Sequence, residues 1–367
     1  MWIRAKKQVR RWLDPLVAPR DRILSAISDE GIHWKREKGV RIDIGGIHNT
    51  QMAYYSFVHR PKDSESRWEM YYHSSDFQNG RWIPRILKAT SSDGLNWQDS
   101  LTPAITAGSN SLNFSQTRAP FLVDFGTFWR MYFTARGSDS VLRILSAISK
   151  NRKEWKVEDG ARIAPELFPL NLCEDRAVTI TGVSDPSVIQ LDDGRLRMYF
   201  ALIKYSEWHQ DIRSAVSTNG IDWKIEDGIR IQTGPKGYIH VANNPCVIRQ
   251  KNGWRMYFRG ADLLPLWNNI FTAFSKDSLH WNVERMALQF RRWNRYERHA
   301  VAFPFVVPLP DGRYRMYYTG YWGNLFDFST VRYYRRIGSK HLSTHYGGNE
   351  PQKSNWLWDK QMYNAFH

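Results

Sequence analysis

The chain has 367 residues, of which 42% are hydrophobic and 24% are charged, as is typical of a globular protein rather than a disordered one. Its two cysteines are too few for a disulfide framework, and no apolar run is long enough to cross a membrane. The net charge of +16 is spread widely along the chain, whereas a phosphate-binding face would concentrate lysine and arginine on one surface. We therefore expect a protein that binds no nucleic acid, and keep nucleic-acid binding as the less favoured alternative.

Residues 1–21 form a segment of their own before the first repeat. Apolar residues such as Trp2 and Trp12 lie among lysines and arginines, which predicts a short basic amphipathic helix. We favour a helix packed on the rest of the protein, and the alternative is peripheral contact of residues 1–13 with a membrane surface. The segment has no hydrophobic stretch followed by a small-residue cleavage site, so we predict no secretory signal and a cytoplasmic location.

One pattern occurs five times, at a period of roughly 60 residues, and such a period indicates a propeller or a solenoid. In every copy a serine precedes a tryptophan by a fixed interval, and the apolar residues before the serine alternate as in a β-strand. The five copies, called Ser–Trp boxes below, contain the pairs Ser28–Trp34, Ser91–Trp97, Ser149–Trp155, Ser217–Trp223 and Ser275–Trp281. Pairs such as Asp93-Gly94 and Asn219-Gly220 predict tight hairpin turns between the two. Five similar copies facing five directions favour a structural hairpin with a buried indole over a binding motif.

A second repeated pair of strands lies between the boxes. Each copy is a strand, a glycine-containing turn and a strand that carries Met-Tyr-Phe or Met-Tyr-Tyr. The copies are residues 116–134, 182–201, 240–259 and 299–319, with a divergent first copy, residues 48–72, that has Gln51 where the others have proline. One such pair and one box hairpin make four strands, the size of a propeller blade.

The order of these pieces predicts how the fold closes. The repeats begin with an orphan outer hairpin, residues 22–42, and end with an orphan inner pair, residues 298–322. Joining the two leaves no open sheet edge. We therefore predict an all-β fold, a five-bladed β-propeller of four-stranded blades over residues 22–322. The aromatic and basic tail, residues 323–367, is expected to pack over one face or to contact a partner.

The first strand of each blade lines the central channel of a propeller, so its start is where a ligand is expected. Just before the proline position the five copies have Thr50, Ala119, Asp185, Asn244 and Phe303, and one residue earlier Asn49, Arg118, Ser184, Asn243 and Ala302. Close to these positions in the sequence are His48, His240, Glu297 and His299. Polar groups that converge in one place are costly to desolvate unless they are paired or used, which predicts a binding site.

At these residues the sequence resembles the five-bladed glycoside hydrolases, the superfamily of arabinanases and β-xylosidases with invertases and levansucrases. The resemblance rests on the Ser-x-Asp-Gly-x-x-Trp boxes and on residues 184–188, Ser-Asp-Pro-Ser-Val, and covers about residues 22–322. It implies three carboxylates: an aspartate that is base or nucleophile, a second aspartate that tunes pKa and holds the substrate, and a glutamate that is the acid. Asp185 matches the second aspartate, whereas Thr50 and Asn243 stand at the other two places.

Glycoside hydrolysis normally needs two carboxylates that flank the scissile bond, and neither threonine nor asparagine supplies one. We therefore predict a modified acid/base set, with Asp185, Glu297 and His299 as catalytic residues. The predicted substrate-binding residues are His48, Asn49, Arg118, His240, Asn243 and Asn244. No motif indicates a metal or another cofactor.

Three functions stay open from the sequence. The first is a glycoside hydrolase-like enzyme that acts on a small glycoside or a glycan precursor. The second is a glycan-binding propeller without catalysis, and the third is a propeller that performs biosynthetic group transfer or elimination.

Overall fold

The computed structural model describes residues 21–48, 50–61, 66–78, 81–107, 114–168, 180–204, 209–231, 233, 241–261, 268–298 and 300–321. All of them belong to one compact unit, Met1–Leu325, and the second unit, Phe326–His367, lies outside the described residues. The predicted amphipathic segment, apart from Asp21, and the predicted tail also lie outside them and stay predictions. No helix in the described part of the chain is long and apolar enough to span a bilayer.

The described residues form an all-β structure, as predicted, in which antiparallel sets of four strands recur. Two of these sets, called sheets two and three below, are joined into one eight-stranded sheet by a parallel bridge between Leu142 and Gly182. Sheet one consists of β3 (Met52–His59), β4 (Trp68–Gln78), β5 (Arg81–Ser91) and β6 (Gln98–Asp99), with β7 (Ile105–Thr106) beside β5. Sheet two consists of β8 (Gln116–Asp124), β9 (Trp129–Arg136), β10 (Leu142–Ser149) and β11 (Lys156–Val157), and is followed by the 3-10 turn η1 (Pro165–Leu167). Sheet three consists of β12 (Ile180–Gln190), β13 (Leu196–Lys204), β14 (His209–Ser217) and β15 (Lys224–Ile225). Sheet four consists of β16 (Ala242–Gln250), β17 (Gly253–Ala261), β18 (Asn268–Ser275) and β19 (Asn282–Leu288).

Sheet five joins the two ends of the repeat region. It consists of β20 (Ala300–Pro308), β21 (Tyr314–Tyr321), β1 (Arg22–Ser28) and β2 (Lys35–Arg36), in that order. β1 pairs with β21 along its whole length, from Arg22 opposite Gly320 to Ser28 opposite Tyr314. The predicted pairing of the N-terminal hairpin with the C-terminal strands is therefore confirmed.

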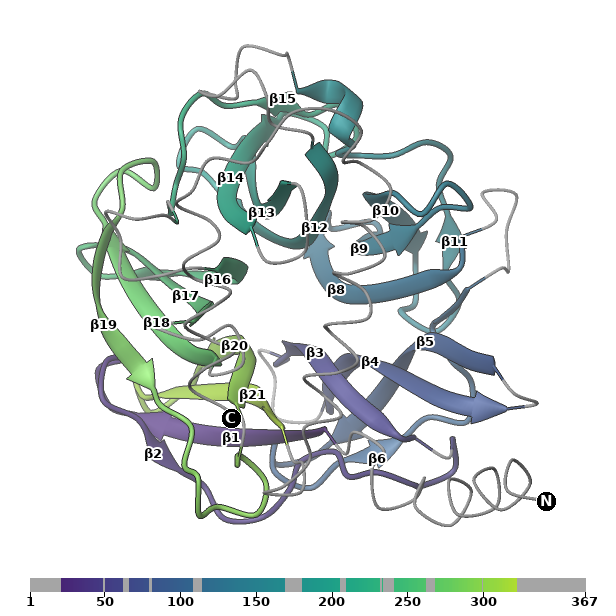
Figure 1. The fold of residues 1–367 in the computed structure, drawn as a ribbon, viewed down its shortest axis with the longest axis vertical. Coiled ribbons are helices and arrows are strands. Elements are labelled where there is room, and N and C mark those ends of the chain that lie inside the picture. The colour runs from purple at the N-terminus through teal and green to yellow at the C-terminus, as the bar shows by residue number, and fades with distance from the viewer. Residues whose placement is uncertain are drawn as a thin grey trace, which may run out of the picture. The chain divides into compact units, whose positions relative to one another are not determined.

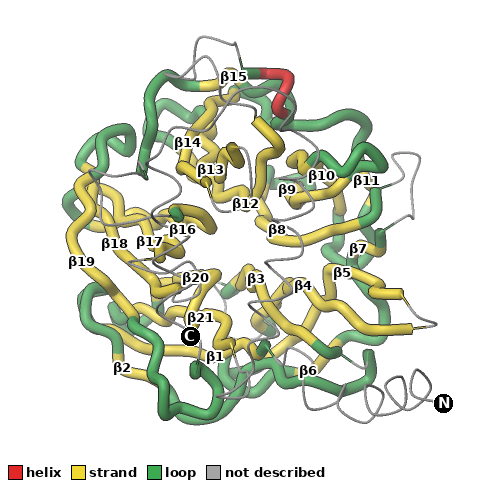
Figure 2. The backbone as a smooth tube through the Cα atoms, in the orientation of Figure 1, coloured by secondary structure: helices red, strands yellow, loops and turns green. Residues whose placement is uncertain are grey.

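The sheets follow one another around a common centre (Figure 1), with the first strand of each sheet innermost. The innermost strands contact one another in cyclic order: β3 with β8, β8 with β12, β12 with β16, β16 with β20, and β20 with β3. Figure 2 shows strands near the centre and most of the turns and loops farther out. This arrangement is that of a β-propeller.

Five tyrosine hydroxyl groups join neighbouring sheets. Each lies on the second strand of its sheet and donates a hydrogen bond of 2.6–2.9 Å to a turn carbonyl in the Ser–Trp box of the next sheet. The pairs are Tyr71–Arg152, Tyr132–Gly220, Tyr199–Ser278, Tyr257–Gly31 and Tyr317–Gly94. The tryptophan of the same box packs edge-on against the same tyrosine, with ring centroids 5.6–5.9 Å apart. The box is therefore the joint between sheets. Its predicted structural role is supported, but of the five box tryptophans only Trp223 is buried, and the other four are half-buried.

The chemistry of the box follows from the turn. In four boxes the serine hydroxyl accepts a hydrogen bond from the backbone N–H of the turn residue that the tyrosine contacts. That residue has a positive φ in all five boxes and is glycine in three of them, Gly31, Gly94 and Gly220. Glycine is also favoured for space, because a Cβ on Gly220 would lie 2.6 Å from the Tyr132 hydroxyl oxygen.

Ion pairs between an arginine and a glutamate recur in four of the sheets. In three sheets an arginine on the second strand pairs with a glutamate that also accepts a hydrogen bond from a serine on the third strand. These groups are Arg130–Glu158–Ser146, Arg197–Glu226–Ser214 and Arg315–Glu37–Ser25, and Arg255 pairs with Glu284 in sheet four. These arginines hold strands together, and because each is matched by a carboxylate they add nothing to the net charge.

Candidate functional site

Every innermost strand has a β-bulge at the same point. At the bulge a residue other than glycine has a φ between 52° and 63°, and these five residues, called the bulge ring below, are Tyr55, Ala119, Asp185, Asn244 and Phe303. Positive φ is uncommon for such residues and costs free energy. Strained positions of this kind cluster at ligand and active sites, so the bulge ring is the candidate site.

The first member of the ring corrects the sequence alignment. Thr50 was expected there, but the structure places Tyr55 at the bulge and Ser56 at the proline position. Thr50 precedes β3 and accepts a hydrogen bond of 3.1 Å from the Ser74 hydroxyl. The alignment was anchored on proline, and it failed in the one copy that has none.

One part of the site is aromatic. The rings of Tyr55 and Phe303 are stacked with centroids 3.9 Å apart, and Tyr54 lies 5.6 Å from Phe303. Two guanidinium groups lie over this pair, that of Arg118 at 5.7 Å from the Tyr55 centroid and that of Arg259 at 5.9 Å from the Phe303 centroid. Both distances are within the range of cation–π attraction.

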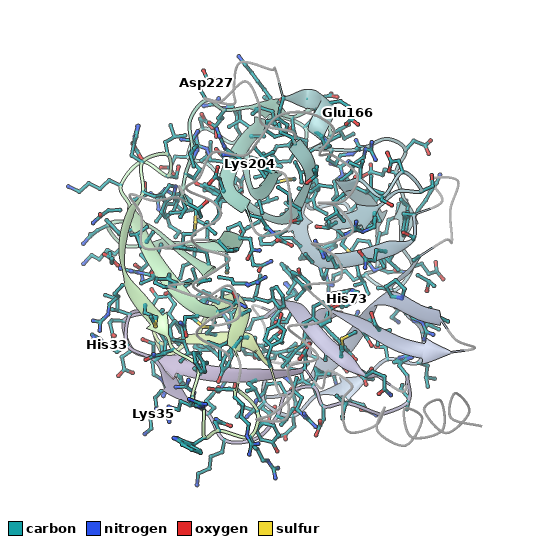
Figure 3. The ribbon with its side chains drawn as sticks, in the orientation of Figure 1. His33, Lys35, His73, Glu166, Lys204 and Asp227 are labelled. Carbon is teal, nitrogen blue, oxygen red and sulfur yellow. The ribbon has the colours of Figure 1, made fainter. Side chains whose placement is uncertain are left out.

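His73 supports the aromatic part from β4, on the central side of that strand (Figure 3), and its ring centroid lies 4.4 Å from that of Tyr54. Its Nδ1 donates a hydrogen bond of 2.5 Å to the Thr117 carbonyl oxygen, and its Nε2 accepts one of 2.9 Å from the Ser75 hydroxyl. Burial lowers the pKa of His73 to about 3, so the ring is neutral at physiological pH. It positions Tyr54 and connects sheets one and two, and it carries no charge to a ligand.

The other part of the site is polar. Asp185 is buried, its backbone N–H donates to the Thr134 hydroxyl at 2.9 Å, and its Oδ2 accepts from the Ser184 hydroxyl at 3.0 Å. Asn243 donates from Nδ2 to Gln210 Oε1 at 2.8 Å. The side chain of Asn244 is 5% exposed, and neither its Nδ2 nor its Oδ1 has a hydrogen-bond partner among the described residues. Buried amides are normally bonded, so solvent or a ligand is the expected partner of Asn244.

Of the predicted site residues that the structure describes, Asp185, Arg118, Asn243 and Asn244 come together on the innermost strands. Glu297 does not join them. It is 1% exposed, pairs with Arg36 on the outermost strand β2 at 2.7 Å, and accepts a hydrogen bond of 2.6 Å from the Tyr318 hydroxyl. These contacts favour a structural role for Glu297.

His48 also lies apart from the bulge ring. Its Nε2 lies 2.7 Å from the carbonyl oxygen of Ser100, which follows the outermost strand of sheet one, β6. The remaining predicted residues, Asn49, His240 and His299, lie outside the described residues, and their roles stay predictions.

The sequence analysis missed Tyr54, Tyr55, His73 and Arg259. Two of them, His73 and Arg259, occupy the same place in the repeat, directly after Met-Tyr-Phe or Met-Tyr-Tyr on the second strand. The five copies have His73, Thr134, Ala201, Arg259 and Thr319 at this place. At this place in the repeat the other three copies have a small residue, so comparing the five copies here would have singled out His73 and Arg259.

One further carboxyl group lies near the junction of sheets five and one. Asp21 precedes β1, and its backbone carbonyl accepts a hydrogen bond of 3.0 Å from the N–H of Ala53 on β3. Burial raises the pKa of Asp21 from 3.8 to about 7, against the opposing attraction of Arg22. This hydrogen bond ties Asp21 to the innermost strand of sheet one, two residues before Tyr55 of the bulge ring.

In the described part of the chain no three histidine, cysteine, aspartate or glutamate side chains are grouped to hold a metal ion.

No protein-family model and no curated protein matches the chain. Among solved structures, a thermostable family-43 glycoside hydrolase matches with a TM-score of 0.55 at 16% identity, over 73% of this chain and 88% of that one. A beta-1,2-mannobiose phosphorylase from Listeria innocua, in complex with beta-1,2-mannobiose, matches with a TM-score of 0.56 at 12% identity, over 73% and 88%. A glycosyl hydrolase from Bacteroides ovatus matches with a TM-score of 0.54 at 16% identity, over 73% and 83%. The expected likeness to propeller glycoside hydrolases is thus confirmed at the level of the fold.

Proposed function

We propose that the chain is a carbohydrate-active five-bladed β-propeller that binds a small glycoside or a glycan precursor at the bulge ring. One observation carries the proposal: the ring brings the stacked pair Tyr55–Phe303 together with the carboxylate of Asp185 and the buried amide of Asn244. A sugar needs both kinds of partner, since its C–H faces pack on aromatic rings while its hydroxyl groups bind carboxylates and amides.

Two regularities of the structure support the proposal of five blades. Each of the five sheets carries one bulge and one Ser–Trp box. The tyrosine hydrogen bonds run from each sheet to the next and return from sheet five to sheet one through Tyr317 and Gly94. We infer a closed propeller whose channel is lined by β3, β8, β12, β16 and β20.

The proposed chemistry is glycosyl cleavage or transfer with a modified acid/base set. Asp185 is the one carboxylate among the five ring residues, and it is held by its contacts with Ser184 and Thr134. There it would bind substrate hydroxyl groups and stabilise the positive charge that develops on the sugar ring in the transition state. His299, predicted as a catalytic residue, is the proton donor we propose, because the contacts of Glu297 occupy its carboxylate.

A glycan-binding protein without catalysis is the second candidate. It is favoured by the other four ring residues, Tyr55, Ala119, Asn244 and Phe303, none of which can act as the second carboxylate of a hydrolase.

The test is Asp185→Asn beside wild type, assayed for turnover of aryl furanosides and pyranosides and for binding of the free sugars by calorimetry. The control is Asp192→Asn, which removes a carboxylate with a highly exposed side chain next to the end of the same strand, β12. Turnover that Asp185→Asn lowers by about 100-fold or more, and that the control keeps, supports the enzyme. Saturable binding without turnover in any variant selects the glycan-binding protein, and the absence of both rejects the proposal.

A further inference from the structure

Arg259 differs from the four arginines that directly precede a Met-Tyr pair on the second strands. Arg130, Arg197, Arg255 and Arg315 each pair with a glutamate. Arg259 is half-buried, yet among the described residues no carboxylate pairs with it and its Nε has no hydrogen-bond partner. A half-buried cation is costly without a counter-charge, so a role in packing is a weak explanation for it.

The place of Arg259 in the repeat strengthens this point. At the same place in sheet two, Thr134 accepts a hydrogen bond from the bulge N–H of Asp185 in the next sheet. A guanidinium group has only donors, so Arg259 cannot accept the corresponding N–H of Phe303. Instead its side chain extends over the Phe303 ring. An arginine here gives up the local hydrogen bond and brings a positive charge to the bulge ring.

A second cation lies on the other ring of the stack. Arg118, beside the bulge of sheet two, places its guanidinium group over Tyr55. Sheets two and four are the neighbours of sheets one and five, so each aromatic ring of the pair receives an arginine from the adjacent sheet. Arginine binds carboxylate and phosphate groups through two parallel hydrogen bonds, and its planar group stacks on aromatic rings at the same time.

We propose that the ligand of the bulge ring is an anionic sugar, whose carboxylate or phosphate group binds Arg259 beside the Tyr55–Phe303 stack, while Arg118 adds a second positive charge over the other ring. This inference rests on the proposed function and names its substrate class. The net charge of +16 adds a long-range attraction for such a ligand.

The test measures the affinity of the full chain for matched pairs of sugars by calorimetry. The pairs are galacturonate with galactose, glucuronate with glucose, and glucose 6-phosphate with glucose, together with short oligomers of the same sugars. We expect the acidic member of at least one pair to bind about 10- to 100-fold more tightly than its neutral partner, with the difference reduced by added salt. A preference within the uronate pairs identifies a carboxylate, and one within the phosphate pair identifies a phosphate.

Three variants assign the preference to Arg259. Arg259→Gln is expected to abolish the preference for the acidic sugar, and Arg259→Lys, which keeps the charge, is expected to retain part of it. Arg313→Gln is the control, because it removes a cation of an exposed ion pair with Asp311 and leaves the ring untouched. Thermal unfolding of each variant checks that it is folded.

The remaining outcomes overturn the inference. Equal binding of acidic and neutral sugars by wild type rejects the anionic ligand and leaves the proposed function standing. A preference that survives Arg259→Gln rejects the assignment to this residue. If no sugar binds, the proposed function fails together with the inference.

Discussion

The buried carboxyl group of Asp21 predicts a stability that falls as pH rises. Its pKa is raised from 3.8 to about 7, mainly by burial, with the attraction of Arg22 as a smaller opposing effect. A group whose pKa is higher in the folded protein than in the unfolded chain binds its proton more tightly when folded. Its contribution to stability is therefore complete below pH 3.8 and is lost as pH rises through 7.

The size of the effect follows from the shift. Three pKa units at about 1.4 kcal/mol each correspond to about 4 kcal/mol between the protonated and the ionised limits. Of this, about 2–3 kcal/mol falls between pH 5 and pH 8, the range that is convenient for measurement. Asparagine has nearly the shape of the protonated acid and does not ionise, so Asp21→Asn removes the dependence.

The assay is urea unfolding of wild type and Asp21→Asn at several pH values between 5 and 8. The variant is expected to gain about 2–3 kcal/mol over wild type across this range, because every other titrating group is common to both proteins and cancels in the difference. The control is Asp43→Asn, a carboxylate that pairs with Arg22 and whose side chain is 58% exposed. Parallel pH curves for wild type and Asp21→Asn would refute the reasoning.

Two further predictions concern the joint between sheets and the neutral histidine. Gly220→Ala is expected to lower the free energy of unfolding by about 2–4 kcal/mol, because the added methyl group meets the Tyr132 hydroxyl at a φ of 72°. Gly126→Ala, at a φ of 81° with open space around it, is expected to lower it by about 1 kcal/mol. Urea unfolding compares the two variants, and equal losses would contradict the steric explanation. The ring proton resonances of His73, assigned with His73→Gln, are expected not to titrate between pH 5 and pH 8, since its pKa is about 3 and the ring gains its proton only in acid. A titration midpoint near pH 6 would show that the ring is not buried as described.

The fold was predictable because the repeat encodes it several times. The interval between serine and tryptophan, the glycine at the turn and the Met-Tyr pair each recur, and each has a partner in the next sheet, as Tyr132 has in Gly220 and Trp223. An error in one copy therefore leaves the architecture unchanged. The site has no such redundancy, since its chemistry depends on the residues in which the copies differ.

The errors at the site have two physical causes. Thr50 was placed in the ring because proline was taken as the marker of the bulge, although the backbone forms the same bulge at Tyr55 with Ser56 after it. Glu297 and His48 were included because they are close to the ring in sequence. Distance along the chain says little about where a loop side chain points, and both were found bound to outer parts of their sheets.

The bulge ring and the Ser–Trp boxes both require a residue with positive φ, but they use different residue types for it. Both place one residue per sheet at positive φ, and the boxes use glycine in three of five turns. The ring uses glycine in none, although glycine would adopt this conformation without strain. Asparagine and aspartate tolerate it, but Tyr55 and Phe303 carry a steric cost of about 1–2 kcal/mol each. If these positions served only to form the bulge, glycine would be the more stable residue. The ring side chains are therefore kept despite their steric cost, which indicates that they have a role in function. They are where the function of this propeller should be tested first.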